Sequence, residues 1–282
     1  MQEVITLGQV MKRIRKERKL TQKMLSHKIC SQSVLSRIEN DEELPNILVM
    51  QQLCERLGVT MDQVVYAQSY EMQAVHQLVT QMEELFFHQQ YRQLKHLMEQ
   101  EQVVEQLYLD ADLQAYYYYR GSCEYFLSEN VDAAIAYLRQ GLAFTYNQDK
   151  EHVTVMEIQL LSCLGWTLTL RKDPTGEKLL QKAVDLAVHL PNQRKTAQLT
   201  KVYFNYAQFL IGKQQFQSAL EVVAKGIAWA QKKKSFYYLE ELLIAKSVVL
   251  ESLNQKEEAQ RFIRLAEEVK FLTNHLNGVD LS

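Results

Sequence analysis

The chain has 282 residues, of which 47% are hydrophobic, so it is long enough for two domains with sizeable cores and is not a disordered protein. It contains only 9 glycines and 3 prolines, which argues against a sheet-rich fold and favours long helices joined by short loops. The net charge of −2 conceals an asymmetry, because residues 1–40 carry a net +6 and the remaining residues −8. A basic end on an acidic body indicates that this end, and not the body, meets a polyanion.

The four cysteines stand far apart and form no CxxC or cysteine–histidine cluster, so we expect no metal site, no other cofactor and no disulfide framework. Unpaired cysteines within apolar helical patterns suit a reducing compartment, and we expect a cytoplasmic protein. Lys12 and Arg13 interrupt the first apolar stretch, which argues against a secretory signal peptide. Because no run of about 18 uncharged apolar residues occurs, we expect neither a membrane span nor a membrane partner.

The first segment predicts five short helices. Apolar residues recur at helical spacing between positions 7 and 14, with basic residues on the opposite face. Thr21, Ser31 and Thr60 are placed to cap the second, third and fifth helices, since a hydroxyl can accept a hydrogen bond from a free amide at a helix start. Gly58 is placed to end the fourth helix. We assign the following apolar residues to the inner faces of the last four helices: Met24, Leu25, Ile29, Val34, Leu35, Ile38, Leu48, Leu53, Leu57, Val64 and Val65.

Beyond about residue 69 the pattern changes to longer amphipathic helices. We therefore divide the chain into a first domain at residues 1–66, a linker at 67–72 and a second domain at 73–282. No stretch rich in proline or glycine marks the linker, so a helix can connect the two domains directly.

The second segment contains a degenerate internal repeat of helix pairs. Successive copies are about 40 residues apart, as at Ala219 and Ala259, which exceeds the roughly 34 residues of the tetratricopeptide repeats that they resemble. With one more divergent pair at 72–106, we expect about five units, stacked into a right-handed α-solenoid whose concave face suits an extended ligand. Small residues would let the two helices of a pair approach: Gly121 with Ala134, Gly165 with Ala183, Ala207 with Ala219, and Ser247 with Ala259.

The most specific pattern in the chain lies at residues 20–40. It reads LTQKMLS at 20–26 and ICSQSVLSRIEN at 29–40, and it resembles the helix-turn-helix domain of the phage-repressor type. Further matching positions extend the resemblance over the whole first domain: Leu7-Gly8, Ile14-Arg15, Pro45 and LGVT at 57–60. The resemblance implies a five-helix DNA-binding domain. It also implies a structural ion pair between Arg15 and Glu39, which match positions that form one in that type.

A helix that reads base edges in the major groove must present short polar side chains. Gln22, at the start of the second helix, is suited to hold a phosphate together with the free amides there. Arg37 can contact guanine or phosphate, or be merely a solvated charge, and Gln32 and Ser33 can equally be helix caps. The candidate DNA-binding residues are Gln22, Lys23, Gln32, Ser33, Ser36, Arg37 and Asn40.

A helix-turn-helix of this type followed by about five tetratricopeptide-like units resembles the peptide-pheromone-responsive transcription regulators of Gram-positive bacteria, the Rgg/PlcR/PrgX-type family. The resemblance is specific over residues 7–65 and architectural over the rest. It implies a cytoplasmic homodimer on double-stranded DNA, with a pseudo-palindromic operator, whose DNA-binding domains are respaced when a short signalling peptide binds the concave face. In the family, asparagines hold the peptide backbone; Asn205 matches such a position, whereas no second asparagine stands near Gly165.

Repeat geometry adds further candidates for the peptide groove. Residues about one turn apart on the first helix of each pair should face inward, although for the aromatic ones we favour ordinary repeat packing over a role in the groove. The candidate peptide-binding residues are Tyr118, Ser122, Tyr125, Gln159, Ser162, Trp166, Lys201, Phe204, Asn205, Gln208, Glu241 and Ile244, with Val248 in the same register.

Two other classes of function are alternatives to a peptide-controlled regulator. One is a DNA-bound scaffold whose repeat domain docks a folded protein, which would bury roughly 1,200 Å² or more. The other is an enzyme, which we do not expect, because no nucleophile motif, glycine-rich phosphate loop or metal-spaced set of ligands is present.

Overall fold

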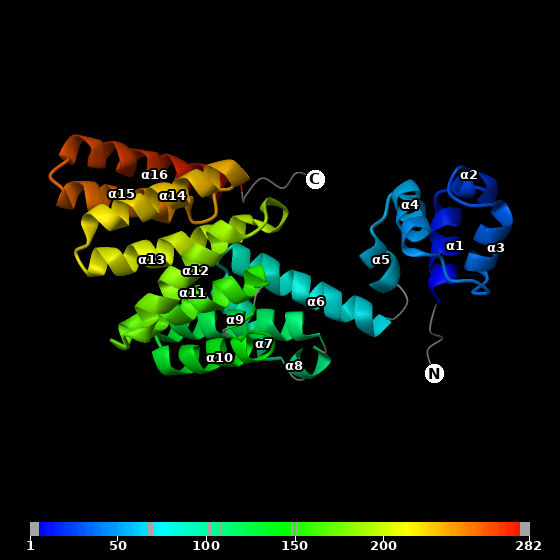
Figure 1. Ribbon diagram of the computed structural model, residues 1–282, viewed down its shortest axis with the longest axis horizontal. Helices are drawn as coiled ribbons and strands as arrows, with labels where there is room; N and C mark the ends of the chain where they lie inside the picture. The colour runs from blue at the N-terminus through cyan, green and yellow to red at the C-terminus, as the bar shows by residue number, and fades with distance from the viewer. Residues whose placement is uncertain are drawn as a thin grey trace. The chain divides into compact units, whose positions relative to one another are not determined.

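A computed structural model describes residues 6–66, 70–100, 103–107, 109–147, 149–150 and 152–276. The described residues form α-helices and two short 3₁₀ turns, with no strand among them (Figure 1). The chain forms two compact units, Met1–Gln81 and Met82–Ser282. The expectation of an all-α protein is confirmed.

The first unit contains the five short helices that the sequence predicts. Thr21 and Ser31 cap α2 and α3, because their hydroxyls accept hydrogen bonds from Met24 N at 3.1 Å and Val34 N at 3.2 Å. Gly58 ends α4 at a φ of 66°, in the left-handed region that glycine tolerates. The helices are α1 (Leu7–Glu17), α2 (Gln22–Ser26), α3 (Gln32–Glu39), α4 (Ile47–Leu57) and α5 (Met61–Tyr66).

The core of the first unit brings α1 and α3 into close contact. A Cβ atom at Gly8 would lie 2.0 Å from the carbonyl oxygen of Ile38, so only glycine fits there. Three of the assigned inner positions were wrong, because Met24, Leu48 and Val65 are 54%, 68% and 38% exposed. At about 100° per residue, Met24 and Val65 are turned by about 100° from Leu25 and Val64, which fill the core instead. Leu48 lies about 140–180° around α4 from the buried Leu53 and Leu57.

Helix α6 (Tyr70–Phe87) contains the division between the two units, which falls after Gln81. Of the linker expected at 67–72, residues 67–69 lie outside the described residues, and residues 70–72 begin α6. The domain limits at 66 and 73 stay predictions from the sequence.

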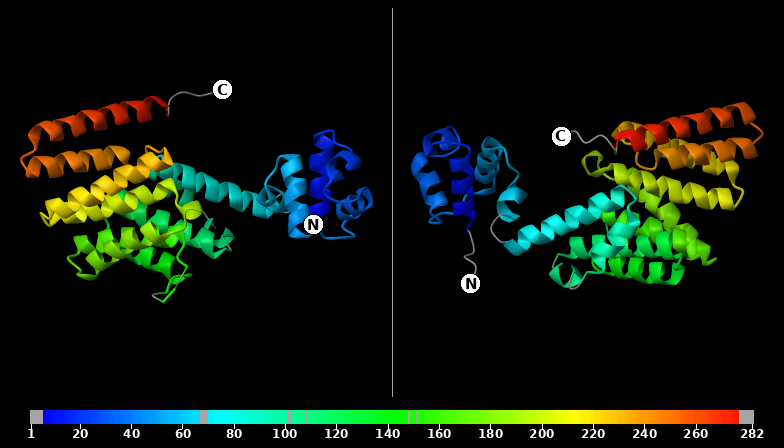
Figure 2. Two further views of the ribbon diagram at one scale, coloured as in Figure 1. Left: turned by 45° about the horizontal axis from the view of Figure 1, so that its top comes forward. Right: turned by 180° about the vertical axis from the view of Figure 1, so that it is seen from behind.

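The second unit is a stack of antiparallel helix pairs that follow one another in chain order (Figures 1 and 2). After α6 come α7 (Tyr91–Met98), α8 (Val103–Gln106), α9 (Asp110–Ser128), α10 (Val131–Ala143), α11 (Val155–Leu170), α12 (Thr175–His189), the 3₁₀ turns Asn192–Arg194 and Ala197–Leu199, α13 (Thr200–Gly212), α14 (Phe216–Lys233), α15 (Leu239–Ser252) and α16 (Lys256–Leu276).

Small residues let the paired helices approach, as the sequence predicts, although Gly165 meets Gly176 and Leu180 and not the predicted Ala183. At Gly165 of α11 an added Cβ would lie 2.9 Å from the carbonyl oxygen of Gly176 in α12. Ser247 of α15 donates a hydrogen bond to the carbonyl oxygen of Ala259 in α16 at 2.9 Å. The two helices of a pair therefore pack closely. Helix α11 also contacts both α9 and α13, so these three first helices lie side by side.

Candidate nucleic-acid interface and ligand pocket

The predicted ion pair between Arg15 and Glu39 is present in the first unit. Arg15 donates from Nε to Glu39 Oε1 at 2.6 Å and from Nη2 to Oε2 at 2.8 Å, a bidentate pair. Glu39 is 1% exposed, and burial by itself would raise its pKa. The hydrogen bonds from Arg15 and Gln22 outweigh burial and hold the pKa of Glu39 below its ordinary value.

A chain of amide hydrogen bonds extends from this ion pair to the surface. Gln22 donates from Nε2 to Glu39 Oε2 at 2.9 Å, and Gln32 donates from Nε2 to Gln22 Oε1 at 2.7 Å. The side chain of Gln22 is therefore held from both ends. These hydrogen bonds hold the first residues of α2 and α3 together, where the sequence predicts a phosphate contact.

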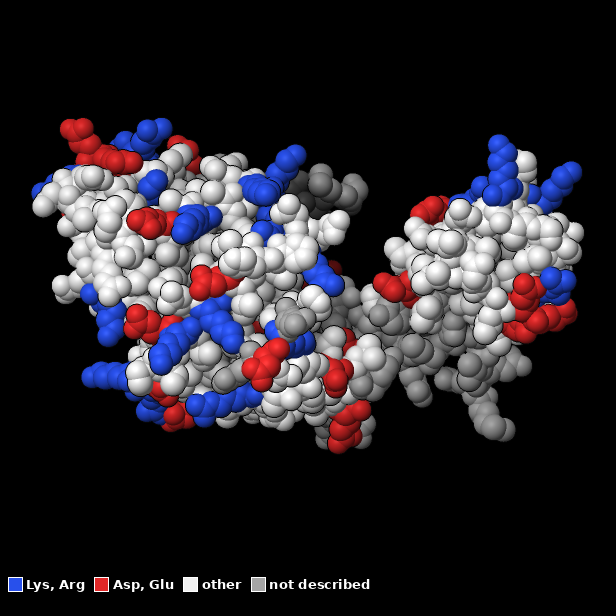
Figure 3. Space-filling model, in the orientation of Figure 1, with Lys and Arg blue, Asp and Glu red and all other residues white. Residues whose placement is uncertain are grey.

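The other candidate DNA-binding residues lie around α3, with Lys23 exposed on α2 and Ser36 half-buried. Arg37 forms an ion pair with Glu43, from Nε to Oε2 at 2.8 Å, with both side chains about half exposed. Asn40 accepts a hydrogen bond from Lys12 Nζ at 3.0 Å, and the Ser33 hydroxyl lies 2.8 Å from that of Ser31. In Figure 3, lysine and arginine side chains project from the part of this unit that holds α2.

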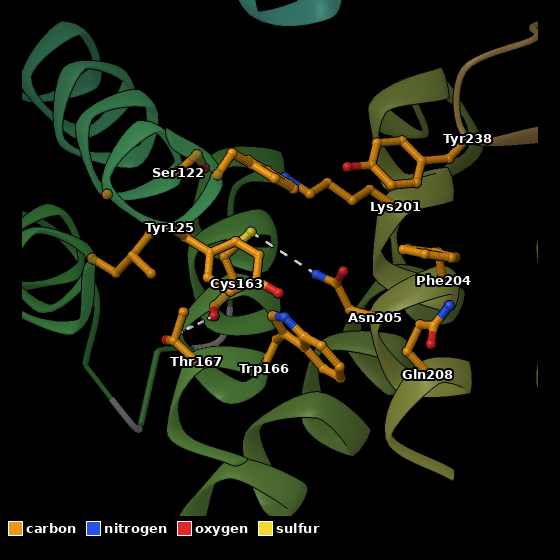
Figure 4. Close-up of a pocket in the computed structure, with 13 residues that line it drawn as sticks. Ser122, Tyr125, Cys163, Trp166, Thr167, Lys201, Phe204, Asn205, Gln208 and Tyr238 are labelled. Atoms are coloured by element: carbon orange, nitrogen blue, oxygen red, sulfur yellow. Dashed lines mark hydrogen bonds between the residues drawn. The ribbon is translucent and has the colours of Figure 1, made fainter. Parts of the chain in front are cut away.

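A pocket of about 300 Å³ lies within the second unit, chiefly between α9, α11 and α13 (Figure 4). Its wall is mostly apolar and aromatic, with a few polar groups, which is typical of sites that bind organic ligands. The lining residues are Gly121, Ser122, Tyr125, Phe126, Leu138, Cys163, Trp166, Thr167, Lys201, Phe204, Asn205, Gln208 and Tyr238.

Asn205 is the most constrained amide of this pocket. It is 5% exposed and donates from Nδ2 to Ser162 Oγ at 3.0 Å, with Cys163 Sγ at 3.9 Å. Within the described residues nothing donates to its Oδ1. Asn205 can therefore accept a hydrogen bond from a ligand without giving up the bond that positions it.

Tyr238 closes the pocket from the residue before α15. Its φ of 56° lies in the left-handed region, which is strained for a bulky side chain. The ring lies 5.2 Å from that of Phe204, between centroids, and is 5% exposed. Such strain persists only where the surroundings hold it, and here it is found on the wall of the pocket.

Seven of the twelve candidate peptide-binding residues line this pocket: Ser122, Tyr125, Trp166, Lys201, Phe204, Asn205 and Gln208. Ser162 and Tyr118 lie behind the wall, hydrogen-bonded to Asn205 and Lys201 respectively. Gln159 and Glu241 line other cavities, and Ile244 is 40% exposed outside this one.

Several residues that line the pocket were not predicted from the sequence. Phe126 lies four residues after Ser122, so continuing that inner face by one turn would have found it. Cys163 and Thr167 directly follow the predicted Ser162 and Trp166 on α11, so a wider inner face would have included them. Tyr238 precedes its helix, where helical periodicity gives no direction. Among the residues that the structure describes, no cluster of three or more potential ligands could hold a metal ion, and no described helix is long and apolar enough to cross a membrane.

Residues 11–64 match the helix-turn-helix family model. Among solved structures, PlcR of Bacillus thuringiensis, in complex with the peptide PapR7 and DNA, is similar over 99% of this chain and 100% of its own, with a TM-score of 0.77 and 19% identity. ComR of S. thermophilus, in complex with DNA and its signalling peptide ComS, is similar over 95% and 94%, with a TM-score of 0.67 and 16% identity. The pheromone receptor Rgg2 of Streptococcus dysgalactiae follows, with a TM-score of 0.59, 15% identity, and 96% and 94% covered.

The chain has the fold of PlcR and ComR. The match covers the short helices of the first unit and the helix pairs of the second together, so the expected architecture is confirmed. No curated protein sequence is significantly similar to the chain.

Proposed function

We propose that this protein is a sequence-specific, DNA-binding transcription regulator whose activity is controlled by a short signalling peptide bound in the pocket of the second unit. The observation that carries the proposal is the similarity, over nearly the whole chain, to PlcR in complex with a peptide and DNA. The pocket supports it independently, because it lies in the repeat unit and combines aromatic walls with Asn205.

The DNA-binding half of the proposal rests on the first unit. Residues 1–40 carry a net charge of +6, and the single helix α3 contains four of the candidate residues, Gln32, Ser33, Ser36 and Arg37. We assign Arg37 to a base or phosphate and Gln22 to a phosphate, since the amide chain from Glu39 holds Gln22 at the start of α2. The remaining contacts, from Lys23 and Asn40, are assigned to the DNA backbone.

The ligand half of the proposal rests on the shape of the pocket. A volume of about 300 Å³ receives a few side chains of a peptide, whereas a folded partner needs a broad surface. Asn205 would hold the peptide backbone through its free Oδ1, and the rings of Trp166 and Phe204 would contact its apolar side chains.

The control of DNA binding requires two arrangements of the protein with different affinity for the peptide. We propose a homodimer in the cytoplasm on a pseudo-palindromic operator, because two half-sites read by a symmetric dimer supply both affinity and spacing. The peptide would favour one spacing of the two DNA-binding units.

The test is the affinity of the full chain for DNA from its own promoter region, at fixed salt and with competitor DNA, with and without synthetic peptides encoded beside its gene. We expect one peptide to shift the specific affinity. Asn205→Ala should abolish the shift, and Asn192→Ala, at an exposed asparagine of the same unit, should keep it.

Specific DNA binding that no peptide alters would remove the ligand half and favour a protein-docking scaffold. If the native chain showed no preference for its promoter DNA over competitor DNA, the proposal as a whole would be wrong. Arg37→Ala with full specific affinity would remove the assignment of Arg37 alone.

A further inference from the structure

Lys201 of α13 is a buried cation inside the pocket wall. It is 4% exposed, and its Nζ lies 5.0 to 5.7 Å from the centroids of four aromatic rings, those of Phe86, Phe126, Tyr118 and Tyr238. Its only hydrogen bond within the described residues is a long one, 3.5 Å, to the Tyr118 hydroxyl. The rings attract an ammonium group but do not neutralise it.

No carboxylate pairs with Lys201 in the part of the chain that the structure describes. The carboxylate of Glu241 is near enough to interact electrostatically with it, yet accepts a hydrogen bond from Gln89 at 3.2 Å. Burial of an ammonium group is costly unless an anion compensates it. The second unit therefore holds a buried positive charge whose counter-ion the described chain does not supply.

Ser122 of α9 is a second buried polar group without a partner, in the same pocket. It is 4% exposed, and its Oγ forms no hydrogen bond within the described residues. In Figure 4 the Lys201 side chain extends from α13 toward α9, the helix that carries Ser122. Buried hydroxyls are nearly always hydrogen-bonded in native proteins, so an unpartnered one on a pocket wall points to a group that arrives from outside.

We propose that Lys201 and Ser122 form a carboxylate-binding subsite, which takes an acidic group of the peptide. This inference rests on the proposed function and adds to it the chemistry of the ligand. One carboxylate would pair with the Lys201 ammonium and accept a hydrogen bond from Ser122 Oγ, so that both groups are satisfied together. The surrounding aromatic rings would contact the apolar atoms next to that carboxylate.

A carboxylate fits this subsite better than a phosphate group. A phosphate monoester carries close to two negative charges at neutral pH, whereas the wall offers one cation among apolar rings. The carboxylate can come from the C-terminus of the peptide or from an aspartate or glutamate side chain, and both sources present the same group.

The experiment measures retention of synthetic heptapeptide pools by the immobilised full chain, read by mass spectrometry. All pools are randomised over uncharged residues and keep a free amino terminus. One has a C-terminal carboxylate and the second a C-terminal amide. The third has the amide and one fixed glutamate, and the fourth the amide and one fixed glutamine.

For the native chain we expect at least one carboxylate pool to be retained about tenfold more than its uncharged counterpart, since a charge-assisted hydrogen bond contributes about 1.5–3 kcal/mol. Preference for the first pool identifies the C-terminus as the source, and preference for the third identifies an acidic side chain. Lys201→Met should reduce the ratio to about one, and Ser122→Ala should lower it about threefold. Lys213→Met, at an exposed lysine following the same helix, should leave it unchanged.

Thermal unfolding separates this role from a structural one. Without its ligand, Lys201→Met should unfold at the same or a higher temperature than the native chain, because methionine fills a similar volume without a buried charge. A lower temperature would assign Lys201 to the stability of the fold. Equal retention of acidic and uncharged pools by the native chain would overturn the subsite and leave peptide binding standing. Retention of no pool would overturn the proposed function as well.

Discussion

At the scale of single residues, the buried ion pair of the first unit has the clearest energetic consequence. Arg15 is 9% exposed and Glu39 1%, so removing one partner leaves the other buried and unpaired. We expect Glu39→Ala to lower the free energy of unfolding of the first unit by about 3 kcal/mol. The measurement is urea denaturation of the full chain with a signal that reports on the first unit. Arg15→Met combined with Glu39→Leu should recover most of this loss, and a double variant as unstable as the single one would contradict the account.

Glu157 makes the stability of the second unit depend on pH. Its carboxylate has no exposed surface and accepts hydrogen bonds from Lys150 Nζ at 2.6 Å, Thr145 Oγ1 at 2.5 Å and the amide of Thr154 at 2.7 Å. Burial alone would raise its pKa, but these bonds hold the pKa below the ordinary value of a glutamate.

A carboxylate with a lowered pKa in the folded state stabilises the protein above its unfolded pKa, and this contribution is lost as the pH falls through the folded pKa. We therefore expect the native chain to unfold at a higher temperature than Glu157→Gln at neutral pH, with the difference shrinking as the pH falls below about 4. Glu221→Gln, at an exposed position of α14, should show little difference at either pH. A difference for Glu157→Gln that stays constant with pH would rule out this titration.

The ion pair between Arg37 and Glu43 competes with the contact that we assign to Arg37. Because both side chains are about half exposed, the pair is worth only about 0.2–1 kcal/mol. Glu43→Gln should therefore raise the affinity for promoter DNA by up to about fivefold, in a titration at fixed salt. Glu42→Gln removes the same charge beside it without releasing Arg37, and should raise the affinity less. Equal effects of the two variants would mean that only the net charge matters.

At the scale of the elements, close helix packing can be tested with two glycines. At Gly165 a Cβ atom would lie 2.9 Å from backbone atoms of both Gly176 and Leu180, so Gly165→Ala must separate α11 from α12. We expect a loss of about 1–3 kcal/mol in the free energy of unfolding. At Gly212, which ends α13, nothing lies within 4 Å of the added atom, and Gly212→Ala should be neutral or stabilising. A stabilising Gly165→Ala would contradict the described packing.

The helices could be predicted because their ends depend on local chemistry. The pocket could be predicted only in part because it depends on long-range packing. The caps at Thr21, Ser31 and Gly58 could be predicted because each depends on residues within one helical turn. The pocket was predicted only in part, because the inner face of a helix depends on how its neighbours are rotated. Gln159 lies on α11 at the expected spacing, for example, yet it lines a different cavity.

At the scale of the whole molecule, the proposed function requires a coupling between a peptide site in one unit and a DNA site in the other. Each unit carries its own chemistry: Arg15–Glu39 and the amide chain in the first, Asn205 and Lys201 in the second. The resemblance predicted the ion pair and Asn205, and repeat geometry placed Lys201 at the groove, but the hydrogen bond between Gln32 and Gln22 was not predicted. A coupling free energy is a property of two states of the assembly, which no single motif contains.

Thermodynamic reciprocity provides the most direct measurement of this coupling. If a peptide changes the affinity of the protein for its promoter DNA by a given factor, that DNA must change the affinity for the peptide by the same factor. We would measure binding of the most effective labelled peptide to the full chain with and without saturating promoter DNA, at one salt concentration. We expect the two factors to be equal and to be lost together in Asn205→Ala; a peptide affinity that does not change with DNA would contradict the coupling.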